Sequence, residues 1–139
     1  MSTELISSRY AGLDLWATAD AVQAMLEGQL AAAAAAQSQV GAIAAAAEAA
    51  AGRLRGPEGR LIYIGAGTSG RLAVQDGVEL GPTFDWAEAR TIHLLAGGMD
   101  AMLTSVEGAE DDEAAAEREI QQAGPTCSDV AIGVAASGR

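Results

Sequence analysis

The sequence contains the stretch Leu61-Ile62-Tyr63-Ile64-Gly65-Ala66-Gly67-Thr68-Ser69-Gly70-Arg71. Its first four residues form an apolar and aromatic run of the kind found in buried strands. The next six fit the pattern G-x-G-x-x-G, and a helical pattern follows directly. A strand, a glycine turn and a helix in this order are typical of an open α/β sheet that holds an anion at the helix N-terminus.

Two further apolar runs have the same character, at residues 91–95 and 130–134, and helical patterns cover roughly residues 69–80, 100–107 and 111–123. This alternation predicts an α/β fold, an open three-layer parallel sheet with strands buried on both faces. Three strands are few, since sheets of this kind have about five or six. We therefore expect a truncated domain.

The chain before this region is rich in alanine. Residues 1–17 have no clear period and are expected to form an irregular arm, Thr18 is a candidate N-cap, and a second helix runs from Val40 to a stop at Gly56-Pro57. The predicted organisation is a helical segment at 1–56 followed by a sheet domain at 57–139. Alanine-rich helices have little side-chain bulk, so they need close contact with the second half of the chain or with another copy.

Charge and composition exclude several classes of partner. The formal net charge of −11 disfavours nucleic acid and anionic membrane surfaces. The first ten residues lack the layout of a secretory signal, which favours a cytoplasmic protein. Cys127 is the only cysteine, so an intrachain disulfide is impossible, and a single cysteine is most often a packing residue. His93, the only histidine, lies in an apolar run, and a structural strand histidine is favoured over a catalytic one.

The glycine turn predicts a phosphate site, and its composition bears on which phosphate it binds. Dinucleotide sites have an acidic residue near the end of the second strand, whereas this strand runs into Ala96-Gly97-Gly98. Thr68 and Ser69 can donate hydrogen bonds to a phosphomonoester. The turn therefore favours a sugar monophosphate over a nicotinamide cofactor, although a glycine turn that binds nothing stays open. Ser137-Gly138 follows the third strand in the same way, where an ordinary turn is the simpler interpretation.

Carboxylates are the candidate groups for proton transfer. Glu79 lies between Val78 and Leu80 near the end of the helix that begins at the glycine turn, and apolar neighbours suit such a role. Glu107 and Glu110 precede a helix, and from spacing alone an acidic first turn that complements the helix dipole explains them better than a catalytic role. From the residues alone, a phosphate-binding α/β domain is as far as the inference goes.

Five segments in order resemble the N-acetylmuramic acid 6-phosphate etherases, which have the sugar isomerase (SIS) fold. They are residues 61–72, Glu79 with Pro82-Thr83-Phe84, Ala96-Gly97-Gly98, residues 106–112 and residues 133–139. The opening segment around Ser8-Arg9-Tyr10 is also similar. The resemblance covers nearly the whole chain but only about the first half of a typical member.

The resemblance implies a homodimeric lyase that removes D-lactate from N-acetylmuramic acid 6-phosphate and leaves N-acetylglucosamine 6-phosphate, without a metal or nucleotide. It implies that Glu79 is the acid and Glu110 the base. It also implies that residues of the two loops hold the 6-phosphate: Gly67, Thr68, Ser69, Gly70, Ser137 and Gly138. The two glutamates are expected to meet across the glycine turn.

This chain departs from the family pattern at one place. Many members have Asp-Ala-Ser-Glu-Cys-Pro-Pro-Thr where this sequence has Asp-Gly-Val-Glu-Leu-Gly-Pro-Thr at residues 76–83. The missing second half should supply further strands and sugar contacts, so we expect weak or no activity from these 139 residues. The rival hypotheses are a SIS-type sugar-phosphate isomerase, a non-catalytic sugar-phosphate sensor and a dinucleotide-binding domain.

Overall fold

A computed structural model describes residues 7–138 of the chain, which divide into two compact units with the boundary between Ala49 and Ala50. The first unit contains two 3-10 helices, Ser8–Tyr10 and Leu13–Leu15, then α1 (Thr18–Gln37) and most of α2 (Val40–Leu54). Thr18 is the first residue of α1 and Ala17 is its N-cap, so the prediction of Thr18 as the cap is wrong by one residue. The boundary predicted at residues 56 and 57 stays a prediction.

The surface of the first unit includes large apolar side chains. Large side chains of α1 are exposed, among them Met25, Leu26 and Leu30. Within residues 7–138, no single helix meets the length and hydropathy required of a membrane-spanning helix, and α1 with α2 meets them only as a pair bent by 63°.

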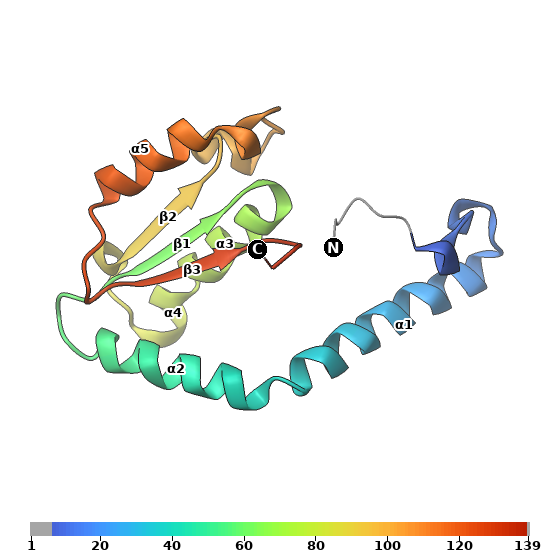
Figure 1. The fold of residues 1–139 in the computed structure, drawn as a ribbon, viewed down its shortest axis with the longest axis horizontal. Coiled ribbons are helices and arrows are strands. Elements are labelled where there is room, and N and C mark those ends of the chain that lie inside the picture. Colours follow the sequence, from blue (N-terminus) through green and yellow to red (C-terminus); the bar gives the residue numbers. More distant parts are fainter. Residues whose placement is uncertain (1–6, 139) are drawn as a thin grey trace. The chain divides into compact units, whose positions relative to one another are not determined.

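The second unit is a parallel sheet of three strands in the order β2-β1-β3, drawn in Figure 1. The strands are β1 (Leu61–Gly65), β2 (Thr91–Leu95) and β3 (Val130–Val134). The helices are α3 (Gly67–Val78), α4 (Leu80–Phe84) and α5 (Glu113–Ala123), and short 3-10 helices lie at Glu88–Arg90, Met99–Met102 and Ala109–Asp111. The predicted α/β fold with a preceding helical segment is confirmed.

The alternation of side chains along β1 explains the layers. Leu61 and Tyr63 pack against Ala73 of α3, whereas Ile64 points to the other face, where α5 lies. The central position of β1 buries Ile62 to 2% exposure. The sheet therefore lies between α3 and α5, because the side chains on each face of the central strand need a helix to pack against.

Strand β3 differs from the sequence-based prediction of strands buried on both faces. Its middle residues, Ala131, Ile132 and Gly133, are exposed, because α5 contacts β2 and leaves this end of the sheet open. Cys127, just before this strand, is also exposed and is not a packing residue.

The helix predicted over residues 100–107 is also wrong. Only a 3-10 helix at Met99–Met102 forms, after Gly97 and Gly98 with φ of 83° and 69°. The carbonyl oxygens of Ala101 and Thr104 accept hydrogen bonds from the Arg71 side chain. In an α-helix these two carbonyls would accept from amides four residues further on, so a long-range contact replaces the local one.

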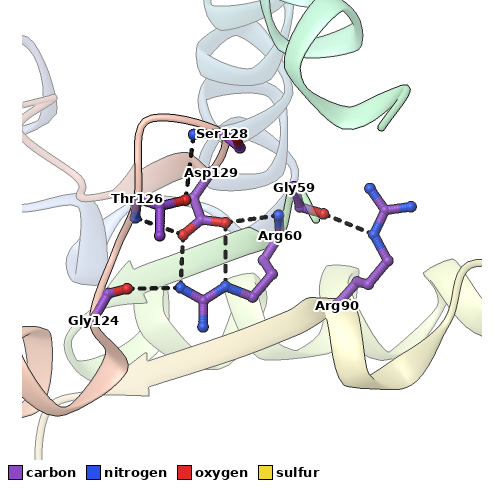
Figure 2. A network of polar contacts seen from close by, with 7 residues as sticks. All are labelled: Gly59, Arg60, Arg90, Gly124, Thr126, Ser128 and Asp129. Carbon is purple, nitrogen blue, oxygen red and sulfur yellow. Dashed lines mark hydrogen bonds and ion pairs between the residues drawn. The ribbon is translucent and has the colours of Figure 1, made fainter. Parts of the chain in front are cut away.

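A partly buried ion pair joins the beginnings of β1 and β3, as Figure 2 shows. Asp129 Oδ2 accepts from Arg60 Nη2 at 2.7 Å, and Asp129 Oδ1 accepts from the Arg60 backbone nitrogen at 2.9 Å. The Arg60 guanidinium also donates to the carbonyl of Gly124 at the end of α5. The hydrogen bonds from Arg60 hold the pKa of Asp129 well below its usual range. Sequence reasoning missed this pair because its partners are 69 residues apart.

Arg90 fixes the end of α2 in the second unit. Its Nη2 atom donates to the carbonyls of Leu54 and Gly56, both at 2.8 Å. Its Nε atom donates to the carbonyl of Gly59 at 2.7 Å, as Figure 2 shows. The guanidinium carbon lies 4.0 Å from the ring centroid of Trp86. A cation at a helix C-terminus satisfies carbonyls that have no partner within the helix.

Candidate functional site

A cleft of about 730 Å³ lies at the carboxyl ends of the strands of the second unit. Its floor includes residues that end each strand or follow it, such as Gly65, Ala96 and Ala135, and one wall is α5. Ligands of open α/β folds bind in this position. The cleft is therefore the candidate site.

The glycine turn brings β1 and α3 into direct backbone contact. A side-chain carbon at Gly65 would lie 2.7 Å from the Gly70 Cα atom, and one at Gly70 would lie 2.7 Å from the Gly65 carbonyl. Gly67 has a positive φ of 51°. These glycines let the strand and helix approach closely, which places the N-terminus of α3 beside the strand end.

The N-terminus of α3 offers the donors expected of an anion site. The first intrahelical hydrogen bond runs from Gly70 N to Ala66 O at 2.9 Å, so the amides of Gly67, Thr68 and Ser69 precede it. Such amides and the positive end of the helix dipole attract anions. Thr68 is exposed and Ser69 is half-buried. The turn thus has the geometry to receive a phosphate, and its fourth predicted residue, Gly70, serves the packing of strand on helix.

The second predicted phosphate loop lies at the same end of the sheet. Gly138, with a φ of 67°, lines the cleft, and Ser137 directly precedes it on the exposed turn after β3. Parallel strands bring both loops to one edge, as the sequence predicted from their positions after β1 and β3.

Glu110 lines the cleft, together with Glu107. It belongs to the 3-10 helix Ala109–Asp111, just before α5. Asp112 is the N-cap of α5, and its Oδ1 atom accepts from the Ala115 amide at 2.9 Å. The acidic helix start predicted here is therefore present, and it leaves the Glu110 side chain available to the cleft.

Glu79 does not line this cleft. It follows the last residue of α3, and the 12 residues of that helix rise about 18 Å from the glycine turn. In Figure 1, α4, which begins at Leu80, lies near the amino ends of the strands, away from the segment that precedes α5. Within one chain, the structure does not bring Glu79 and Glu110 together across the glycine turn.

A polar cluster lies under the last turn of α3. Tyr63 Oη donates to Asp76 Oδ2 at 2.7 Å, and its ring stacks on that of His93 at 5.9 Å between centroids. Burial, with the hydrogen bond to Asp76, raises the pKa of Tyr63 to about 12. Burial lowers the pKa of His93, and among the described residues its Nε2 atom has no hydrogen-bond partner. His93 is partly exposed, which is one of the two alternatives predicted for a strand histidine, and its structural role stays a prediction.

Two other groups near the site have no role in the function predicted from the sequence. Arg71 ends the quoted stretch, and its side chain turns to the loop after β2 instead of the cleft. Glu119 of α5 lines the cleft as a half-buried carboxylate. Glu119 lies three and four residues after Ala116 and Ala115, so the three residues share one face of α5. This helical spacing could have been recognised in the sequence.

Comparison with known proteins gives a consistent result. A family model described as the glucokinase regulatory protein N-terminal SIS domain matches residues 40–139. An N-acetylmuramic acid 6-phosphate etherase of Deinococcus radiodurans is 49% identical over 137 residues, which are 98% of this chain and 44% of that protein. A protein of the same name from Streptomyces coelicolor is 42% identical over 140 residues, 100% of this chain and 44% of that protein.

A third relative matches a shorter region. The protein of that name from Geobacillus thermodenitrificans is 58% identical over 81 residues, which are 58% of this chain and 28% of that protein. The chain thus spans less than half the length of these curated relatives. The resemblance read from the sequence is confirmed, and the chain belongs to the SIS-domain family, in the group that includes the N-acetylmuramic acid 6-phosphate etherases.

Proposed function

We propose that this chain forms the phosphate-binding part of an etherase that converts N-acetylmuramic acid 6-phosphate to N-acetylglucosamine 6-phosphate and D-lactate. The observation that carries the proposal is the position of Glu110 in a cleft beside the N-terminus of α3. The names of the relatives support the substrate class, a sugar monophosphate. A cytoplasmic location and a homodimer are parts of the same proposal.

In the proposed reaction, the amides and hydroxyls of Thr68 and Ser69 hold the 6-phosphate, with Ser137 on the other side. The open-chain aldehyde acidifies the C2 proton, and Glu110 removes it. The electron pair forms a C2–C3 double bond as the C3–O bond breaks, and Glu79 protonates the departing lactate oxygen. Water then adds, with hydroxide at C3 and a proton at C2, so atoms and charge balance.

This mechanism needs a Glu79 that reaches the cleft, and α3 separates Glu79 and Glu110 within one chain. We therefore propose that the acid comes from a second copy of the protein. Isologous dimers place the same two groups together twice, so each site would combine Glu110 of one copy with Glu79 of the other.

The first experiment uses an etherase that contains this chain as its phosphate-binding part and measures D-lactate released from N-acetylmuramic acid 6-phosphate. Glu110→Gln and Glu79→Gln should each reduce the rate by about 10²-fold or more, since each removes a proton-transfer group. Glu117→Gln, an exposed glutamate of α5 outside the cleft, is the matched control. A sugar-phosphate isomerase would give a rearranged sugar without lactate, and a sensor would bind the sugar phosphate unchanged after Glu79→Gln.

The second experiment mixes the two inactive variants. If each site combines two copies, mixed dimers regain one intact site, and about a quarter of the wild-type rate should return after random exchange. If both glutamates act within one chain, mixing restores nothing, and the two-copy site has to be given up.

A further inference from the structure

Arg71 links the phosphate-binding helix to the loop that carries the catalytic candidate Glu110. Its Nε atom donates to the carbonyl of Ala101 at 2.7 Å, and its Nη2 atom donates to the carbonyl of Thr104 at 3.0 Å. The residue is half-buried in the first turns of α3. Two hydrogen bonds to backbone carbonyls from one guanidinium fix both its direction and the segment that it contacts.

The position of Arg71 directly after the Gly-Thr-Ser-Gly turn suggests an obvious role as a ligand of the phosphate. The geometry is against this role, because its Nε and Nη2 donors are engaged with the loop after β2. The proposed anion site is instead formed by the amides of residues 67–69 and the hydroxyls of Thr68 and Ser69 at the N-terminus of α3. Arg71 therefore has a function other than direct binding of the phosphate.

The loop that Arg71 holds leads directly to the cleft. Val106 lies against Gly97, where an added side-chain carbon would be 3.0 Å from the Val106 Cβ atom, and both residues line the cavity. Glu107 and Glu110 follow within the same loop. By taking the carbonyls of Ala101 and Thr104, Arg71 keeps this segment from continuing as a helix and directs it over the carboxyl ends of the strands.

We propose that Arg71 is a positioning residue, which holds the loop of residues 101–110 so that Glu110 faces an anion bound at the N-terminus of the same helix. This inference rests on the proposed function for the role of Glu110. The contact of Arg71 with the loop does not depend on the proposed function. Because one side chain spans from the phosphate turn to the loop, displacement of the loop would separate the base from the substrate without removing any phosphate ligand.

The experiment compares Arg71→Met, Arg71→Lys and the control Arg118→Met, an exposed arginine on α5. Hydrogen exchange of the backbone amides is measured by mass spectrometry, and binding of N-acetylglucosamine 6-phosphate by calorimetry. Arg71→Met should speed exchange in residues 99–110 by about tenfold or more, while β1 and α5 keep the wild-type rates. Arg71→Lys should give an intermediate rate, since an ammonium group cannot reproduce the planar pair of donors.

Affinity for the sugar phosphate should change by less than about threefold in Arg71→Met. Unchanged exchange in residues 99–110, or a loss of affinity of more than about tenfold, would overturn the positioning role in favour of a direct phosphate ligand. Faster exchange throughout the unit would overturn it in favour of general stabilisation. If the wild-type chain binds no sugar phosphate, the proposed function fails, while the exchange measurements still decide whether Arg71 holds the loop.

Discussion

The His93 ring occupies the space that a side chain at Gly77 would need. A carbon atom added at Gly77 would collide with His93 Nε2 and would lie 3.1 Å from His93 Cδ2 and 3.2 Å from Tyr63 Cδ2. Gly77 and His93 are therefore complementary in size. Gly77 lies two residues before Glu79.

We expect Gly77→Ala to lower the free energy of unfolding by about 1–3 kcal/mol, because the ring must leave its stacked position on Tyr63. Combining it with His93→Ala should cost less than the sum of the two single changes, since the smaller side chain frees the space. Urea denaturation of the four proteins measures this coupling. Gly52→Ala is the control, because no atom lies near that helical position, and it should be neutral or stabilising. Additive effects would contradict the size complementarity.

His93 should also make stability depend on pH. Burial lowers its pKa in the folded state, so the unfolded chain binds the proton more readily. Its contribution is fully present above the unfolded pKa of about 6.5 and is lost as pH falls towards the folded pKa. His93 is the only histidine, so His93→Gln should flatten the decline in urea midpoint between about pH 7.5 and 5.5. An identical decline in the variant would exclude His93 as its source.

The ion pair of Arg60 with Asp129 should govern stability in acid (Figure 2). The pKa of Asp129 is depressed by hydrogen bonds from Arg60, so this stability is present above the unfolded pKa of about 4 and is lost as pH falls below it. Asp129→Asn should lower the Tm at neutral pH by about 5 °C or more and weaken its dependence on acid. Thermal unfolding followed by circular dichroism tests this.

The matched control for Asp129 is Glu117→Gln, an exposed carboxylate in α5. It should leave the Tm within about 2 °C of the wild-type value. A loss in the control equal to that in Asp129→Asn would mean that overall charge, and not the Arg60–Asp129 pair, sets the stability.

The contact of Gly65 with Gly70 should tolerate no side chain. Gly70→Ala would press a carbon against the Gly65 carbonyl and the Leu95 side chain, and the backbone partner cannot turn away. We expect a loss of about 1–3 kcal/mol in the free energy of unfolding. Gly133→Ala in β3, where no atom lies within 4 Å, should change it by less than about 0.5 kcal/mol. Equal effects in denaturant titrations would show that strand and helix do not depend on this approach.

The local pattern of the sequence determined most of the elements. Apolar runs predicted β1, β2 and β3, and the glycine turn predicted where α3 begins, because these features depend on residues close together in the chain. The helix at residues 100–107 was predicted wrongly by the same reasoning. The carbonyls of Ala101 and Thr104 accept hydrogen bonds from Arg71, which lies 30 and 33 positions away in the sequence, so no local pattern predicts this contact.

The sequence by itself determined the chemistry available at the carboxyl ends of the strands: glycines that admit close packing, hydroxyls for a phosphate and carboxylates for a proton. Only the tertiary structure decided which of these groups meet. It placed Glu110 in the cleft, put the length of α3 between the cleft and Glu79, and paired Arg60 with Asp129. The physical reason is that helix direction and strand pairing bring distant residues together or hold them apart, whereas composition and spacing fix only what each residue can do.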